Sequence, residues 1–147
     1  MPGIVVGVDG SPNSERALDW AMKEAAVKHA PLTVIAVHPA MKSYFTRADN
    51  PVTLSEDSAA IEKMQEAAEE MTQKAASRLG DARPPSVNVH MVNGFAAKEL
   101  LDASHDADLV VVGSRGGGGF GRLMLGSVSS QVIHHAACPV VVVPHEK

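Results

Sequence analysis

The chain has 147 residues, of which 45% are hydrophobic and 20% are charged, and its formal net charge is −4. This length predicts a single domain over residues 1–147. The negative charge argues against nucleic acid as a partner, because nucleic-acid-binding domains carry basic patches. The single cysteine excludes a disulfide within the chain, and no apolar stretch approaches the roughly 20 residues that span a membrane. The first ten residues, MPGIVVGVDG, lack the basic region that begins a signal peptide, so a cytoplasmic location is expected.

The first strand and the first helix are predicted from an apolar run and the residues that follow it. Residues 3–8, GIVVGV, are rich in β-branched residues, as in a strand that is buried on both faces. Ser11 suits the N-cap of a helix, and Pro12 suits its first position, where a missing N–H is no loss. Pro31 is expected to stop this helix, and a second strand is predicted over residues 32–38.

A second helix is predicted over residues 56–79, after a long irregular segment at residues 39–55 whose role the sequence leaves open. Thr53 and Glu56 have the spacing of a capping box, and Gly80 is a plausible C-cap. Alanine, methionine and leucine side chains recur at helical spacing and predict the buried stripe. The stripe consists of Ala60, Met64, Ala67, Met71, Ala75 and Leu79.

The second half of the chain alternates strands and helices. Residues 87–92, VNVHMV, alternate in polarity, which predicts a strand at a sheet edge. A helix over 95–106, a strand over 108–114, a helix over 127–136 and a strand over 139–143 follow. This alternation predicts an α/β fold, in which a five-stranded parallel sheet is doubly wound with helices on both faces. We expect the Rossmann-like, adenine nucleotide alpha hydrolase-like form of that fold.

A glycine-rich segment, GSRGGGGFGRLMLGSVSS, spans residues 113–130, between the fourth strand and the last helix. In an open parallel sheet, ligands bind beyond the carboxyl ends of the strands. Glycines let backbone N–H groups approach a phosphate, and a helix N-terminus adds positive potential. The segment therefore favours a phosphate site over a plain surface loop. It does not match a Walker A motif, because Arg122 and Leu123 occupy the positions of the lysine and the hydroxyl residue.

The spacing of Gly113, Gly116 and Gly126-Ser127 resembles the G-x2-G-x9-G-[ST] signature of the universal stress proteins. The resemblance extends to VVGVDGS near the start of the chain and ACPVVVVP near its end. It implies a five-stranded α/β fold, usually as a homodimer. Many members bind ATP or a related adenine nucleotide, and the intact glycine signature places this sequence with them.

The resemblance also implies a role for individual residues. Asp9 resembles the acid that contacts the adenosine, and Val37 resembles the residue whose backbone reads the adenine. Gly113 would meet the ribose. The phosphates would be held by four residues: Gly116, Gly126, Ser127 and Val128. Three neighbours are further candidates for the same nucleotide site: Gly10, Ser11 and Arg115. For Asp9 a helix-capping role before Pro12 stays open, and for Val37 the alternative is a plain strand residue.

The implied function is that of a stress-response sensor or regulator that binds ATP, while ADP, AMP and cyclic AMP stay open as ligands. No metal-ligand set is indicated among the side chains, so any Mg²⁺ would be held through the phosphates. Two alternatives remain: a slow ATPase or phosphotransferase, and a dimeric scaffold with an empty site. The last strand is uncharged and strongly β-prone, so we expect a homodimer through Val140, Val141, Val142 and Val143.

Overall fold

A computed structural model of the chain describes residues 2–37, 53–92, 95–114 and 126–144, and the side chains of all of these except residues 53–58 and 60. Strands and helices alternate in the predicted order. The elements are β1 (Ile4–Val8), α1 (Pro12–Lys28), β2 (Leu32–Val37), α3 (Thr53–Ser77), a 3-10 turn η1 (Gly80–Ala82), β3 (Val87–Val92), α4 (Ala96–Ser104), β4 (Leu109–Gly113), α5 (Ser127–His135) and β5 (Val140–Val143).

The five strands form one parallel sheet in the order β3-β2-β1-β4-β5. The chain builds outward from β1 to β2 and β3, then returns to place β4 on the other side of β1. The predicted fold, a doubly wound five-stranded parallel sheet, is confirmed. β3 lies at one edge, and its residues alternate between half-buried and exposed over Val87–His90, as its polarity pattern predicts.

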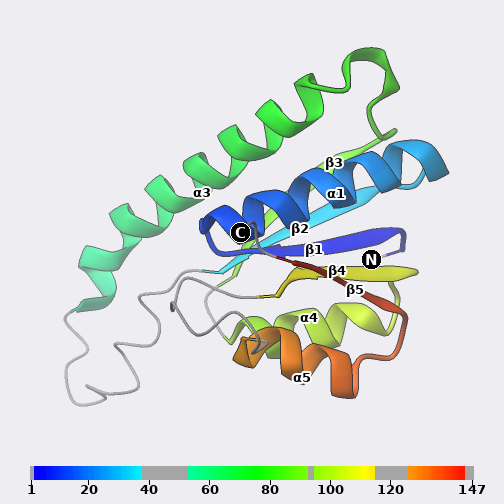
Figure 1. Cartoon of the computed structure of the whole chain (residues 1–147). Helices are drawn as coiled ribbons and strands as arrows, with labels where there is room; N and C mark the ends of the chain where they lie inside the picture. Colours follow the sequence, from blue (N-terminus) through cyan, green and yellow to red (C-terminus); the bar gives the residue numbers. More distant parts are fainter. Residues whose placement is uncertain (1, 38–52, 93–94, 115–125, 145–147) are drawn as a thin grey trace.

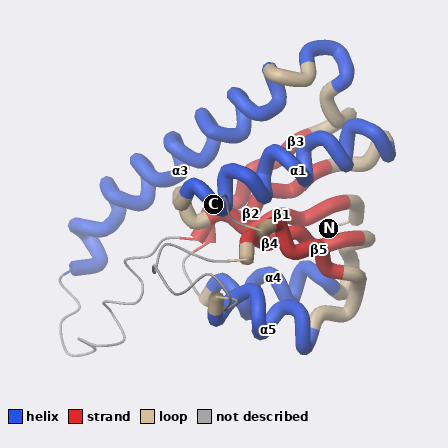
Figure 2. Tube along the Cα trace, viewed as in Figure 1, coloured by secondary structure: helices blue, strands red, loops and turns tan. Residues whose placement is uncertain are grey.

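Helices α1 and α3 cover one face of the sheet, and helices α4 and α5 cover the other (Figures 1 and 2). One hydrophobic core lies under α1 and α3 and includes Val6, Leu18 and Val34, which are 0% exposed. The other lies under α4 and α5 and includes Val5 and Val110. Successive residues of β1 therefore enter opposite cores, which explains why its sequence is apolar throughout.

Helix α1 begins as predicted but ends earlier. Ser11 is its N-cap, and the Ser11 hydroxyl accepts a hydrogen bond from the Ser14 N–H at 3.2 Å. Pro12 takes the first helical position. The helix ends at Lys28 because His29 adopts a left-handed conformation with φ 52°, and its N–H caps carbonyls of the last turn. The stop therefore precedes Pro31 and does not depend on it.

Helix α3 departs from the prediction in its bounds and in its buried face. It begins at Thr53, three residues early, so the proposed capping box is not established. It ends at Ser77, and Gly80 begins η1 with a left-handed φ of 57°. The fully buried residues of α3 are Ala68, Thr72, Ala75 and Ala76. Of the predicted stripe, Ala75 is thus buried, Met71 and Leu79 pack against the core, and Ala67 is exposed. The first half of α3 projects beyond the sheet (Figure 1), so the predicted stripe reaches the core only along the second half of the helix.

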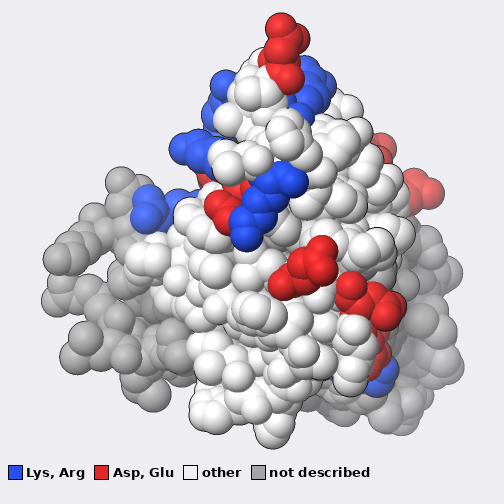
Figure 3. All heavy atoms as spheres, turned by 90° about the vertical axis from the view of Figure 1, so that its right-hand side faces the viewer, with Lys and Arg blue, Asp and Glu red and all other residues white. Residues whose placement is uncertain are grey.

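Figure 3 turns the amino-terminal edge of the sheet toward the viewer. Acidic and basic side chains lie beside one another on this face, around a larger uncharged area. One such pair joins the end of α3 to α1, where Arg78 Nη1 lies 2.7 Å from Asp19 Oδ1. None of the helices in the described ranges has the length and hydropathy needed to cross a membrane.

Candidate functional site

The carboxyl ends of the strands bring the predicted site residues to one edge of the sheet. Val8 pairs with Ala36 in β2, which places Asp9 next to Val37. On the other side of β1, Val6 pairs with Val111, so that the end of β1 lies level with Gly113. The order of the strands reverses at β1, and such a switch point is where open α/β sheets bind ligands.

A cavity of about 360 Å³ opens at this edge, on the face covered by α1 and α3. Its volume lies within the range of small-molecule sites, about 300–1,000 Å³. Of the predicted site residues, Asp9, Gly10 and Val37 line it together. The remaining lining residues come from β1, α1, β2, α3 and β3: Val8, Glu15, Ala36, Met64, Ala67, Ala68, Glu70, Met71, Lys74 and Met91.

Asp9 takes part in the turn that starts α1. Its Oδ1 accepts a hydrogen bond from the Ser11 N–H at 2.9 Å, and Gly10 between them has a φ of 86°, which favours glycine. This bond lies in the turn before the helix, and the N-cap of α1 is Ser11. Asp9 is exposed and lines the cavity, so the turn holds its carboxylate at the place where a ligand would meet it. The Ser11 hydroxyl is already used as the N-cap.

A hydrogen bond joins two residues of the glycine-rich segment, Ser114 after β4 and Gly126 before α5. The Gly126 N–H donates to the Ser114 carbonyl at 2.8 Å, and Gly126 is the buried N-cap of α5. The Gly126 N–H is thus already used. The donors that a helix start leaves without intrahelical partners begin at Ser127, which is exposed, and Val128. The predicted residues Arg115 and Gly116 lie outside the described residues.

Asn13 is a part of this edge that the sequence analysis missed. It is buried in the first turn of α1, and its Nδ2 donates to the Val143 carbonyl at 3.2 Å. The Ser114 hydroxyl lies 3.4 Å from its Oδ1, and a Cβ on Gly113 would approach its side chain to 3.0 Å. One signal pointed to it: Asn13 stands four residues before Ala17, on the apolar face of the helix, where a polar residue needs a buried partner.

No residue of α3 was assigned to the site from the sequence, although several of them line the cavity. Met64 and Met71, which the sequence places in the buried stripe, both line the cavity, and Met71 also packs against the core under α1 and α3. Glu70 and Lys74 lie beside them, with 3.6 Å between Glu70 Oε1 and Lys74 Nζ. Helical periodicity identified an apolar stripe, but it does not tell whether the stripe faces a sheet or a cavity. In the described part of the chain, no three His, Cys, Asp or Glu side chains converge as a metal site.

Comparison with known proteins assigns the family. The sequence profile of the universal stress protein family matches residues 2–144. The chain belongs to the universal stress protein family. A universal stress protein of Mycolicibacterium smegmatis is 37% identical over 141 residues, which are 96% of this chain and 47% of that protein. This universal stress protein chain thus spans about half the length of the curated relatives it matches.

Solved universal stress proteins share the fold. UspA from Lactobacillus plantarum matches with a TM-score of 0.77 at 22% identity, and the match covers 97% of each chain. A universal stress protein solved in complex with cyclic AMP matches with a TM-score of 0.67 at 25% identity, over 99% of this chain and 98% of that chain. The sheet and its covering helices are therefore those of the family.

Asn13 provides a test of how this edge is held. Asn13→Ala removes the donor to Val143 and the buried partner of Ser114, so we expect the free energy of unfolding to fall by about 1–3 kcal/mol. Asn88→Ala, on the exposed face of β3, is the matched control and should change it by less than about 0.5 kcal/mol. Urea denaturation measures both variants. Equal effects would contradict the assigned role of Asn13.

Proposed function

We propose that this universal stress protein chain binds an adenine nucleotide, with ATP as the first candidate, across the carboxyl edge of its sheet. The observation that carries the proposal is the placement of the cavity and the start of α5 at the same edge, on either side of β1. A nucleotide has one apolar end and one anionic end. The two parts of the edge offer one environment for each.

The charges around the cavity orient the ligand in this proposal. Among the described residues, Asp9, Glu15 and Glu70 bring three carboxylates to its lining, against the ammonium group of Lys74. A triphosphate would be repelled there, whereas a base and a ribose would not. The start of α5 offers backbone N–H groups and the positive end of a helix dipole, both of which favour phosphate. The base and ribose therefore lie in the cavity, and the phosphates lie at Ser127 and Val128.

The solved relative in complex with cyclic AMP supports an adenine nucleotide as the ligand class. Cyclic AMP and ATP share the adenine, the ribose and at least one phosphate, which are the groups that the two parts of the edge would recognise. Mg²⁺ enters the proposal only as an ion held through the phosphates. The identity of the ligand is tested by mass spectrometry of nucleotide released from the purified protein, followed by calorimetry with ATP, ADP, AMP and cyclic AMP.

A sensor role follows from the position of the ligand between the two helical layers. In this proposal the nucleotide contacts α3 on one face of the sheet and α5 on the other. Its binding then stabilises the arrangement of both layers by an amount that grows with ligand concentration. A partner protein that binds either helical layer would then bind more tightly or more weakly as the nucleotide concentration changes, because the stability of that layer changes with it.

Gly126 tests the phosphate end. Gly126→Asp places a carboxylate at the start of α5, and we expect ATP affinity to fall roughly tenfold or more because of like-charge repulsion. Gly126→Asn is the matched control: it has nearly the same size and is an equally good N-cap, but it carries no charge, so its loss should be smaller. Calorimetry measures both affinities, and circular dichroism checks the fold. Undiminished ATP binding by Gly126→Asp would contradict the assignment.

Asp9 tests the nucleoside end. Asp9→Asn keeps an oxygen acceptor for the Ser11 N–H but removes the charge that would receive ribose or amine hydrogen bonds. We expect a loss of about 1–3 kcal/mol in binding free energy, equal for ATP and AMP. Asp19→Asn, on the outer surface of α1, is the control for a lost charge. A loss confined to ATP would instead place Asp9 at the phosphates or their metal ion.

We also propose that β5 forms a homodimer edge. It lies at an edge of the sheet, beside β4. The carbonyls of Pro139 and Val143 face β4 and accept hydrogen bonds from the N–H groups of Val110 and Ser114. Since backbone groups alternate along a parallel strand, the N–H and C=O groups of Val140 and Val142 face away from the sheet. The helices that contact β5 add exposed apolar side chains, Trp20 from α1 and Ile133 from α5.

Val142 separates edge pairing from folding. Val142→Pro removes an outward N–H and leaves the β4–β5 ladder intact, so self-association should weaken while the sheet persists. Val142→Ala is the control, because it loses a similar side-chain contact but keeps the N–H. Analytical ultracentrifugation over a range of concentrations measures both variants. If Val142→Pro associates as strongly as Val142→Ala, the dimer does not form through this edge.

A further inference from the structure

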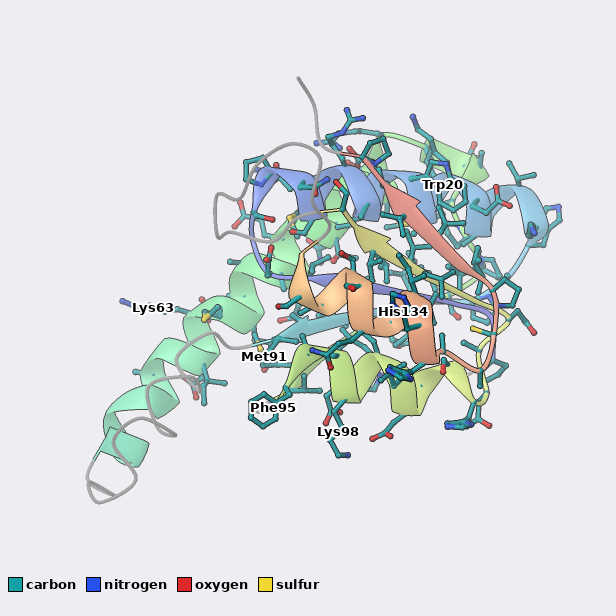
Figure 4. The ribbon with its side chains drawn as sticks, turned by 60° about the horizontal axis from the view of Figure 1, so that its bottom comes forward. Trp20, Lys63, Met91, Phe95, Lys98 and His134 are labelled. Atoms are coloured by element: carbon teal, nitrogen blue, oxygen red, sulfur yellow. The ribbon has the colours of Figure 1, made fainter. Side chains whose placement is uncertain are left out.

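Methionine side chains are concentrated at the cavity. Of the four whose side chains are described, Met22 is buried in the core under α1 and is 1% exposed. The other three, Met64, Met71 and Met91, all line the cavity and are half-buried. Met64 and Met71 come from α3, and Met91, which is labelled in Figure 4, comes from β3. Two separate elements thus direct thioethers into one space.

These thioethers suit the flat apolar face of a base. A methionine sulfur is polarizable and makes favourable contacts with aromatic rings, and its flexible side chain adapts to the shape of a ligand. The rest of the apolar lining consists of smaller side chains, including Val8, Ala36 and Ala68. If a base occupies the cavity as proposed above, the methionines supply the largest part of its apolar surroundings.

Half-burial also makes the three sulfurs reachable by a small oxidant, while Met22 is enclosed. We propose that Met64, Met71 and Met91 are an oxidation site and that their oxidation by a two-electron oxidant such as hypochlorous acid releases the nucleotide. Each thioether gains one oxygen atom and becomes a sulfoxide, so that the sulfur loses two electrons. The chlorine of hypochlorous acid takes up those electrons and leaves as chloride with a proton. The link to nucleotide release rests on the proposed function, whereas the oxidation site itself does not.

The physical reason for release is the polarity of the product. A sulfoxide oxygen is a strong hydrogen-bond acceptor, and oxidation turns a flexible apolar side chain into a polar one. The apolar part of the lining, which includes Val8, Ala36 and Ala68, donates no hydrogen bond from its side chains. The ammonium group of Lys74 also lines the cavity, but it already lies 3.6 Å from Glu70 Oε1. A base in the cavity would exclude water from the new dipoles, and burying an unpaired polar group is costly. We expect a loss of affinity of roughly 10-fold to 100-fold.

The oxidation site is tested by peptide mass spectrometry after graded treatment of the intact protein with hypochlorous acid. We expect Met64, Met71 and Met91 to be oxidised well before Met22, and we expect saturating ATP to slow their oxidation without changing that of Met22. Equal oxidation of all four would overturn the site. The order in which the methionines are oxidised tests the oxidation site even if the untreated protein binds no nucleotide. Absence of nucleotide binding would refute the proposed function and the link to nucleotide release, but not the oxidation site.

The link is tested by substituting the three methionines together. Met64→Leu, Met71→Leu and Met91→Leu preserve side-chain volume but cannot be oxidised at these positions. The ATP affinity of the triple variant can differ from that of the unmodified protein before treatment, and we expect treatment to leave that starting affinity unchanged. Met22→Leu is the matched control and should lose affinity as the unmodified protein does. Both proteins retain Cys138, so a loss caused by thiol oxidation would appear in both. Methionine sulfoxide reductases should restore binding to the oxidised unmodified protein. An equal loss in the triple variant would overturn the proposal.

Discussion

The backbone of Ser114 holds the carboxyl edge of the sheet together. Its N–H donates to the Val143 carbonyl at 2.9 Å, and its carbonyl accepts from the Gly126 N–H at 2.8 Å. The end of β4 is thereby fixed to the end of β5 and to the start of α5. The Val143 carbonyl uses its second lone pair for Asn13 at 3.2 Å, which ties α1 to the same point. Elements from both layers therefore meet at two adjacent strand ends.

The two ends of the proposed nucleotide site are built in physically different ways. The phosphate end consists of backbone groups whose positions are set by the Ser114 and Gly126 bonds, and backbone geometry tolerates little adjustment. The base end is lined by methionine side chains and by α3, which packs on the sheet through small residues such as Ala68 and Ala75. The first half of α3 extends past the sheet. A substitution or modification thus changes the base end more readily than the phosphate end.

The sequence predicted features that depend on near neighbours in the chain. The cap at Ser11 and Pro12 and the alternation that marks β3 as an edge need no knowledge of distant residues. Prediction from the sequence failed for features that depend on contacts between residues far apart in the chain. Periodicity showed the stripe of Met64 and Met71, but the reach of α3 beyond the sheet decided what the stripe faces. Asn13 is explained only by Val143, which lies 130 residues later.

The proposed site and the proposed dimer edge share β5. Val143 closes the nucleotide end of this strand through its bonds with Ser114 and Asn13, and the outward groups of Val140 and Val142 begin one residue away. Coupling between two sites requires an element whose energy both of them change. A phosphate at the start of α5 acts on Gly126 and, through Ser114, on the bonds of Val143. A partner strand would bond to Val140 and Val142, on the outer side of the same strand. β5 is therefore the element through which occupancy of the nucleotide site and association of the protein would affect one another.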